Sequence, residues 1–180
     1  MKFKKIIIGL LIITGMLIAV NFIAKNYVFP FKHEKVIEKY SKENDLDPYF
    51  VLAVIKAESK FCSDAKSNKN AVGLMQITEN TALWIAEKME LDDYSSDKLY
   101  EEEYNIKMGC FYLRDLENEF GNEDLVIAAY NAGRGKVKEW LNDKRYSKDG
   151  EKLSYIPYAE TKNYVDKVKI YYKIYKFLYD

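Results

Sequence analysis

The sequence predicts an all-α fold, in which a compact helical domain follows one helix able to span a membrane. Apolar residues make up 48% of the chain, with only 3 prolines and 8 glycines, which favours long helices over a turn-rich β architecture. Several segments place apolar residues at helical spacing, and no stretch alternates convincingly as a strand. The 180 residues leave room for one sizeable core behind the N-terminal segment.

The N-terminal segment has the pattern of a membrane helix. Lys2, Lys4 and Lys5 precede an apolar run over 6–24 whose one strongly polar member is Asn21. At about 1.5 Å per residue, this run reaches roughly the 30 Å of a bilayer core. The positive flank favours a cytoplasmic N-terminus. We therefore expect a single-pass protein of the cell membrane with its domain on the extracytoplasmic side.

A cleaved signal peptide is the alternative, and it gives the same topology. The length of the run favours an uncleaved anchor. So does the lack of a small-x-small cleavage pattern, because Ala19 and Ala24 have Leu17 and Phe22 two residues before them. The expected organisation is a signal-anchor over residues 1–25, a connector over 26–32 and one folded domain over 33–180.

Capping signals delimit the helices of the domain. Asp47 and Pro48 open a helix, because Asp accepts backbone hydrogen bonds as an N-cap and Pro suits the first helical position. Gly121 and Gly133 end two others. In order, we expect helices over 34–44, 48–61, 78–89, 105–120 and 124–131, a short one over 137–141, and a long one after Pro157.

Charge and composition exclude several functions. With 28 basic and 28 acidic side chains, no net field draws the protein to nucleic acid. His33 is the single histidine, and we interpret it as a surface residue, which leaves no imidazole for Ser-His-Asp or Cys-His catalysis or for common zinc sites. Cys62 and Cys110 suit either one structural disulfide or two buried thiols.

Glu58 is anomalous within the helix expected over 48–61. It lies on an apolar face, opposite Lys56 and Lys60. A carboxyl there is either paired with the amides of a neighbouring loop or held partly dehydrated with a raised pKa, which suits a general acid near neutral pH. The pattern alone favours the structural role. The other members of the face are Val51, Val54, Ile55 and Cys62.

The motifs around Glu58 favour the general acid over the structural role. Residues 58–61 read Glu-Ser-Lys-Phe, 73–77 read Gly-Leu-Met-Gln-Ile, and 128–133 read Ala-Ala-Tyr-Asn-Ala-Gly. Over roughly 35–178, this combination resembles the lytic transglycosylase family, whose catalytic domain has a goose-type-lysozyme-like fold. The combination is far more specific than any one motif. Its other elements are Ser67, Thr81-Ala82, Asn105-Ile106, Gly109, Tyr112-Leu113 and Glu160 with Tyr164-Val165.

The resemblance implies that Glu58 is the catalytic acid/base. Ser67 and Gln76 can hydrogen-bond acetamido and hydroxyl groups of the sugar, and Tyr130 offers a ring face and a hydroxyl. Glu160 can orient the side chains that surround the sugar. The alternative roles are structural: a loop-holding amide for Gln76, a core aromatic for Tyr130 and a helix-start carboxylate for Glu160. The substrate-binding residues implied are Ser67, Met75, Gln76, Tyr130, Asn131, Glu160 and Tyr164.

The implied reaction is cleavage of the β-1,4 bond from N-acetylmuramic acid (MurNAc) to N-acetylglucosamine (GlcNAc) in peptidoglycan, leaving a 1,6-anhydro end. Most glycosidases need two carboxylates, whereas this sequence offers one well-supported carboxyl. The expected partners are glycan strands and the membrane, with no cofactor, metal or nucleic acid. The alternatives are a hydrolytic, lysozyme-like muramidase and a non-catalytic wall-binding scaffold.

One position departs from the family pattern. The family usually continues Gly-Leu-Met-Gln-Ile with Met-Pro, whereas this chain has Thr78-Glu79. The family's Met normally touches substrate, so we expect the groove contacts on this side to differ from those of the family. Thr78 is a good N-cap for the helix that follows. The Gly-Arg-Gly-Lys stretch at 133–136 lacks the spacing of a phosphate loop and follows no strand.

Overall fold

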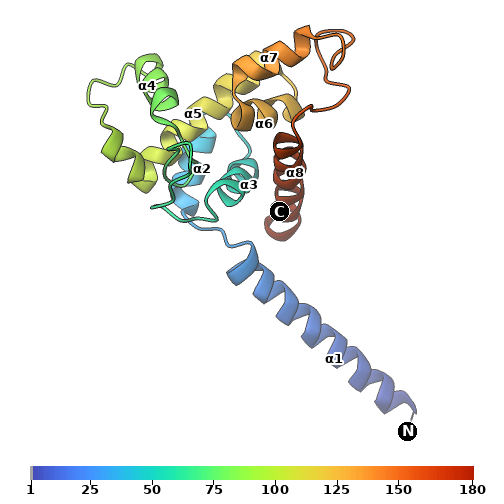
Figure 1. Cartoon of the computed structure of the whole chain (residues 1–180). Coiled ribbons are helices and arrows are strands. Elements are labelled where there is room, and N and C mark those ends of the chain that lie inside the picture. The colour runs from blue at the N-terminus through green and yellow to red at the C-terminus, as the bar shows by residue number, and fades with distance from the viewer. Residues whose placement is uncertain (1) are drawn as a thin grey trace.

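The computed structural model describes residues 2–180, and this part of the chain is all-α, as predicted. Figure 1 shows α1 projecting from a compact domain formed by the other helices. Two isolated antiparallel bridges, Lys66 with Val72 and Val72 with Ile77, are the only β pairing within the described residues. The elements are α1 (Lys2–Ile23), the π-helix η1 (Ala24–Val28), α2 (Glu34–Glu43), α3 (Pro48–Glu58), α4 (Glu79–Lys88), the 3-10 helix η2 (Ser96–Tyr100), α5 (Glu102–Phe120), α6 (Glu123–Ala132), α7 (Arg134–Asn142) and α8 (Ala159–Tyr179).

The predicted capping residues are confirmed. The Asp47 carboxylate accepts a hydrogen bond from the Tyr49 amide at 2.8 Å, at the start of α3. The Thr78 hydroxyl accepts one from the Thr81 amide at 3.3 Å, at the start of α4. Gly121 ends α5 in the left-handed region, with φ at 59°. These caps involve residues close to one another in the chain, so the sequence is enough to predict them.

Two segments differ from the expected boundaries. Helix α3 stops at Glu58 rather than near residue 61, because Lys60 and Phe61 take φ values of 53° and 65° that no helix tolerates. The expected connector over 26–32 is helical as far as Val28, where η1 continues α1. The 3-10 helix η2 was not predicted, since its Ser-Asp-Lys-Leu-Tyr sequence carries no helical stripe.

Three other expectations need correction. His33 is partly buried at the start of α2, where its Nδ1 lies 3.1 Å from the Glu102 carboxylate, so it is not a free surface residue. Cys62 and Cys110 form no disulfide, and only Cys110 is buried. Cys62 is exposed because the turn after α3 carries it off the apolar face. Burial raises the pKa of the Cys110 thiol, which keeps it protonated.

Helix α3 forms the centre of the core. Residues 50–55 are all buried, so this helix is covered on every side. It packs antiparallel to α8: the Tyr164 hydroxyl contacts Glu58 at one end, and the Tyr49 hydroxyl donates to the Tyr179 carbonyl at 3.0 Å at the other. Helices α2, α5 and α6 contribute the other main core residues, which include Ile37, Ile106, Met108, Leu113, Leu116, Val126 and Ile127.

Asn105 fastens the loop over 72–77 to α5. Its side chain is fully buried and has three backbone partners. Its Oδ1 accepts from the Met75 amide at 2.7 Å, and its Nδ2 donates to the carbonyls of Val72 at 3.1 Å and Leu99 at 2.8 Å. Gly109, one turn further along α5, leaves room for Met75, since a Cβ there would lie 2.1 Å from the Met75 sulfur.

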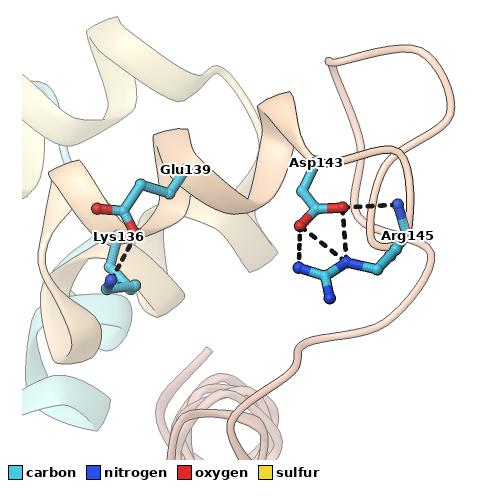
Figure 2. Close-up of polar contacts among 4 residues, drawn as sticks. All are labelled: Lys136, Glu139, Asp143 and Arg145. Atoms are coloured by element: carbon cyan, nitrogen blue, oxygen red, sulfur yellow. Dashed lines mark hydrogen bonds and ion pairs between the residues drawn. The ribbon is translucent and has the colours of Figure 1, made fainter.

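Helix α7 and the turn after it lead the chain back towards α8. Figure 2 shows Lys136 paired with Glu139 along α7, and Asp143 at its end holding Arg145. The Asp143 carboxylate accepts from the Arg145 amide at 2.9 Å and from its guanidinium Nη2 at 2.6 Å. Lys136, Glu139 and Arg145 are exposed or half-exposed, so these contacts shape the turn and contribute little stability.

We expect Asn105→Ala to lower the free energy of unfolding by about 3 kcal/mol, because it leaves buried backbone groups without partners. Urea denaturation of the purified chain in detergent measures this. Asn118→Ala, on the exposed side of the same helix, is the matched control and should have little effect. Equal stability of the two variants would contradict the role of Asn105 as a structural fastening.

Candidate active site

A groove of about 360 Å³ lies where four segments of the domain meet. These segments are the end of α3, the loop before α4, the end of α6 and the start of α8. The loop reaches the groove because Asn105 and Gly109 hold its far side against α5. The lining residues are Glu58, Ser67, Asn68, Lys69, Ala71, Gln76, Thr78, Tyr130, Asn131 and Glu160.

Glu58 is the acidic group at the base of this groove. It is the last residue of α3, and its Oε1 accepts a hydrogen bond from the Tyr164 hydroxyl at 2.5 Å. Burial raises the pKa of Glu58 to about 7, although the Tyr164 hydrogen bond and the positive charge of Lys167 both oppose this rise. Near neutral pH the carboxyl is therefore divided between its protonated and ionised forms, as a group that must both give and take a proton requires.

Two tyrosines enclose the carboxyl. Burial, and next the negative charge of Glu58, raise the pKa values of both Tyr130 and Tyr164, so both hydroxyls remain donors. Tyr164 uses its proton on Glu58. The Tyr130 hydroxyl donates to the Met75 carbonyl at 2.7 Å, and its ring lies 5.5 Å from that of Tyr112. Tyr130 thus joins α6 to the loop while lining the groove.

The polar side chains of the loop have structural partners of their own. The Ser67 hydroxyl accepts from the amides of Lys69 at 3.2 Å and Ala71 at 3.1 Å. The Gln76 amide nitrogen donates to the carbonyls of Ala65 at 3.0 Å and Gly73 at 2.9 Å. The loop-holding role considered for Gln76 is therefore present, and its side chain lines the groove as well.

Five of the seven predicted substrate-binding residues line the groove with Glu58, and two do not. Met75 is fully buried, with its side chain packed on Gly109, so we withdraw it as a substrate contact. Tyr164 is also buried and touches the carboxyl rather than the groove. The five residues in the groove are Ser67, Gln76, Tyr130, Asn131 and Glu160.

The sequence interpretation did not include four other lining residues. Asn68, Lys69 and Ala71 lie within four positions after Ser67, so their proximity to this residue was the available signal. Thr78 had been assigned only as a cap, and its position in the groove shows that the departure from Met-Pro alters the wall itself. Among residues 2–180, no group of three or more His, Cys, Asp or Glu side chains is placed to hold a metal ion.

The all-α domain, with one dehydrated glutamate at the base of an open groove, agrees with the lysozyme-like fold that the motifs implied. The family model described as "Transglycosylase SLT domain" matches residues 35–153. The chain belongs to this family, as the resemblance of its motifs indicated.

Sequence relatives agree with this assignment. The soluble lytic murein transglycosylase of Salmonella typhimurium is 33% identical over 151 residues, which cover 82% of this chain and 23% of that protein. The membrane-bound lytic murein transglycosylase C of Sodalis glossinidius is 32% identical over 116 residues, covering 59% of this chain and 32% of that protein. The chain thus spans about a quarter to a third of the length of these relatives.

A solved structure gives the same fold. An inactive glutamate-to-glutamine mutant of the lytic transglycosylase Slt from Pseudomonas aeruginosa superposes with a TM-score of 0.72 at 34% identity. The match covers 83% of this chain and 24% of that one. It confirms the predicted all-α, lysozyme-like fold.

The raised pKa of Glu58 has a consequence for stability. The folded protein binds this proton more tightly than the unfolded chain, so the stabilising contribution is complete below about pH 4.5 and is lost as the pH rises through about 7. We expect Glu58→Gln to match the wild type at pH 4.5 and to exceed its free energy of unfolding by up to about 3 kcal/mol at pH 8.5.

Thermal and urea unfolding at the two pH values measure this difference. Glu87→Gln, at an exposed position of α4, is the control and should show no pH-dependent gain. A Glu58→Gln variant that is less stable than wild type at pH 8.5 would contradict a dehydrated carboxyl and favour the paired structural role.

Proposed function

We propose that the chain is a peptidoglycan lytic transglycosylase, which cleaves the MurNAc-GlcNAc β-1,4 bond and forms a 1,6-anhydroMurNAc end. The observation that carries the proposal is the buried carboxyl of Glu58, with a pKa near 7, at the base of the groove. Family membership and the names of the relatives support it. The Pseudomonas structure adds support, since that relative is inactive with a glutamine in place of a glutamate.

In the proposed mechanism, protonated Glu58 gives its proton to the glycosidic oxygen as the bond to the anomeric carbon breaks. The acetamido oxygen of the same MurNAc stabilises the anomeric centre. The Glu58 carboxylate then takes the proton of the sugar's 6-hydroxyl, whose oxygen attacks the anomeric carbon. No water is consumed, and Glu58 ends protonated as it began. The tethered 6-hydroxyl competes well with water because its effective concentration is high.

The groove residues have distinct proposed roles. The Tyr164 hydroxyl positions the Glu58 carboxyl and opposes part of the pKa rise, so it tunes the acid without needing to contact sugar. Ser67, Gln76 and Asn131 offer polar atoms for hydroxyl and acetamido groups, and Tyr130 offers a ring edge. Glu160, exposed in the first turn of α8, is a second carboxylate of the groove.

Glu160 is the group on which a muramidase mechanism would depend. Most glycosidases use a second carboxylate to activate water or to stabilise the anomeric centre, and Glu160 is the other acidic residue lining the groove. We favour the transglycosylase because Glu160 is solvent-exposed, whereas the Glu58 carboxyl is largely buried and its pKa is raised to about 7.

We expect Glu58→Gln to lower the rate of glycan cleavage roughly 100-fold to 10,000-fold while wall binding persists, because an amide cannot deliver a proton. Digestion of purified cell walls, followed by mass analysis of the products, measures the rate and the chemistry together. Wild-type products should carry anhydro ends, each lighter by one water than a reducing end.

Glu160→Gln separates the two mechanisms. Under the transglycosylase proposal it lowers the rate but leaves the anhydro product, because Glu160 transfers no proton. If wild-type products carry only hydrated ends and Glu160→Gln abolishes them, the enzyme is a muramidase. If Glu58→Gln cleaves at the wild-type rate, Glu58 is not the acid/base and the proposed mechanism is wrong. If the wild-type protein binds walls but releases no glycan, the non-catalytic scaffold alternative is supported instead.

We also propose that residues 1–25, which contain α1, are an uncleaved anchor and that the catalytic domain over 33–180 faces the extracytoplasmic side. The segment Phe3–Val28 is long and apolar enough to cross a membrane. It contains an 18-residue window with a mean hydropathy of 2.7, and no residue of this window is buried in the domain. The basic residues Lys2, Lys4 and Lys5 support a cytoplasmic N-terminus. A membrane-bound relative supports association with the membrane.

Protease added outside intact protoplasts should digest residues 33–180, and the undigested full-length chain should sediment with membranes. The physical reason is that an apolar helix of this length partitions into the bilayer and the basic flank stays inside. Recovery of a soluble form that lacks the N-terminal segment would contradict the anchor while leaving export intact. Protection of the domain in intact protoplasts would contradict the orientation.

A further inference from the structure

The segment after α1 is fastened to the end of α8. The Tyr179 hydroxyl lies 3.0 Å from the Lys25 carbonyl and 2.9 Å from the Phe29 carbonyl. The Tyr175 hydroxyl donates to the Pro30 carbonyl at 3.3 Å. These contacts join residues about 150 positions apart in the chain. The end of α8 is therefore held beside the point where α1 meets the domain, as Figure 1 shows.

Aromatic packing strengthens this junction. The Phe29 ring meets the rings of Tyr171 and Tyr175 edge to face, each with centroids 5.5 Å apart. The Phe31 ring meets Tyr179 in the same way at 5.5 Å. Such pairs restrict the orientation of the chain between them. These contacts thus hold the segment that follows α1 against the C-terminal half of α8.

The end of the apolar helix reaches past the bilayer core. The helix over Phe3–Val28 has 26 residues, which at about 1.5 Å each exceed the roughly 30 Å of hydrocarbon. Its last turn therefore belongs in the headgroup layer. Tyr27 lies in that turn with 76% of its surface exposed, and tyrosine is enriched at this depth because it has an apolar ring and a polar tip.

Phe177 has no covering contact in the domain. It is 87% exposed, the highest value for a large apolar side chain among the residues that the structure describes. It lies two positions before Tyr179, at the same end of α8 that contacts Lys25. Lys173 and Lys176, which are also exposed, precede it by four positions and one position on the helix. An exposed apolar aromatic next to lysines is typical of an interfacial membrane anchor.

We propose that Phe177 and Tyr27 insert into the interfacial layer of the bilayer that α1 crosses, so that α8 makes a second contact with lipid. The domain is then held by two points rather than one. Thirteen residues, or roughly 20 Å of helix, separate Phe177 from Tyr164 at the candidate active site. The inference rests on the proposed membrane anchor and is independent of catalytic activity.

Spin labels on the full-length chain test this contact in vesicles of phosphatidylcholine and phosphatidylglycerol. Cys62→Ser removes the exposed thiol, while Cys110 is buried and does not react. A label is then placed at Phe177→Cys or, as an exposed reference far from α1 in the chain, at Tyr155→Cys. We expect the ratio of oxygen to nickel-chelate accessibility to be severalfold higher at 177 than at 155, since oxygen concentrates in lipid.

A third label at Ile13→Cys, in the middle of α1, separates the inference from the anchor on which it rests. A lipid signal at 13 with an aqueous signal at 177 overturns the inference and leaves the anchor standing. An aqueous signal at both positions overturns both. If neither oxygen nor the nickel chelate reaches the label at 177, and the labels at 177 of two chains lie at one defined distance, a second copy of the chain covers this position. The proposed lipid contact is then wrong.

Discussion

The antiparallel packing of α3 on α8 is the constraint on which the site and its attachment both depend. One end of the pair places Tyr164 on Glu58, and the other places Tyr49 on the carbonyl of Tyr179. Between these ends, Lys56 of α3 lies over the Phe29 ring, 4.6 Å from its centroid, and donates to the Val28 carbonyl. A shift of either helix would therefore disturb the acid and the junction with α1 together.

The groove combines a dehydrated carboxyl, Glu58, with polar side chains that already form hydrogen bonds within the protein. Ser67, Gln76 and Tyr130 all bond the backbone of the loop over 65–76, so their positions hold without substrate. This preorganisation is favourable for catalysis, because little reordering accompanies binding. Because these neighbours bond the loop, the side-chain hydrogen bond to Glu58 comes from Tyr164. Burial therefore outweighs hydrogen bonding, and the pKa of Glu58 stays high.

The sequence predicted what local chemistry determines. The caps at Asp47 and Thr78, the stop at Gly121 and the acidic residue on an apolar helix all follow from spacing and residue type. The motifs located most of the groove wall. Features that depend on tertiary context were missed or misplaced. Met75 was assigned to substrate, and only its approach to Gly109 on another helix shows that it is core.

Other errors have the same origin. The exposed position of Cys62 depends on the positive φ angles of Lys60 and Phe61. Residues other than glycine seldom adopt such angles, and no pattern of side chains predicts them. Tyr164 and Glu58 are 106 residues apart, so their hydrogen bond required the packed fold to be visible. Likewise, η1 extends a helix through a stretch whose composition suggested a connector.

The close junction between α1 and the domain changes how such a protein meets its substrate under the proposed topology. A domain on a long flexible linker would sweep a volume of the wall, whereas a domain fastened at Tyr175 and Tyr179 moves only as its membrane helix drifts laterally. The search for glycan then becomes two-dimensional. Encounter frequency depends on bilayer fluidity, and the strands within reach are those that lie in a thin layer beside the membrane.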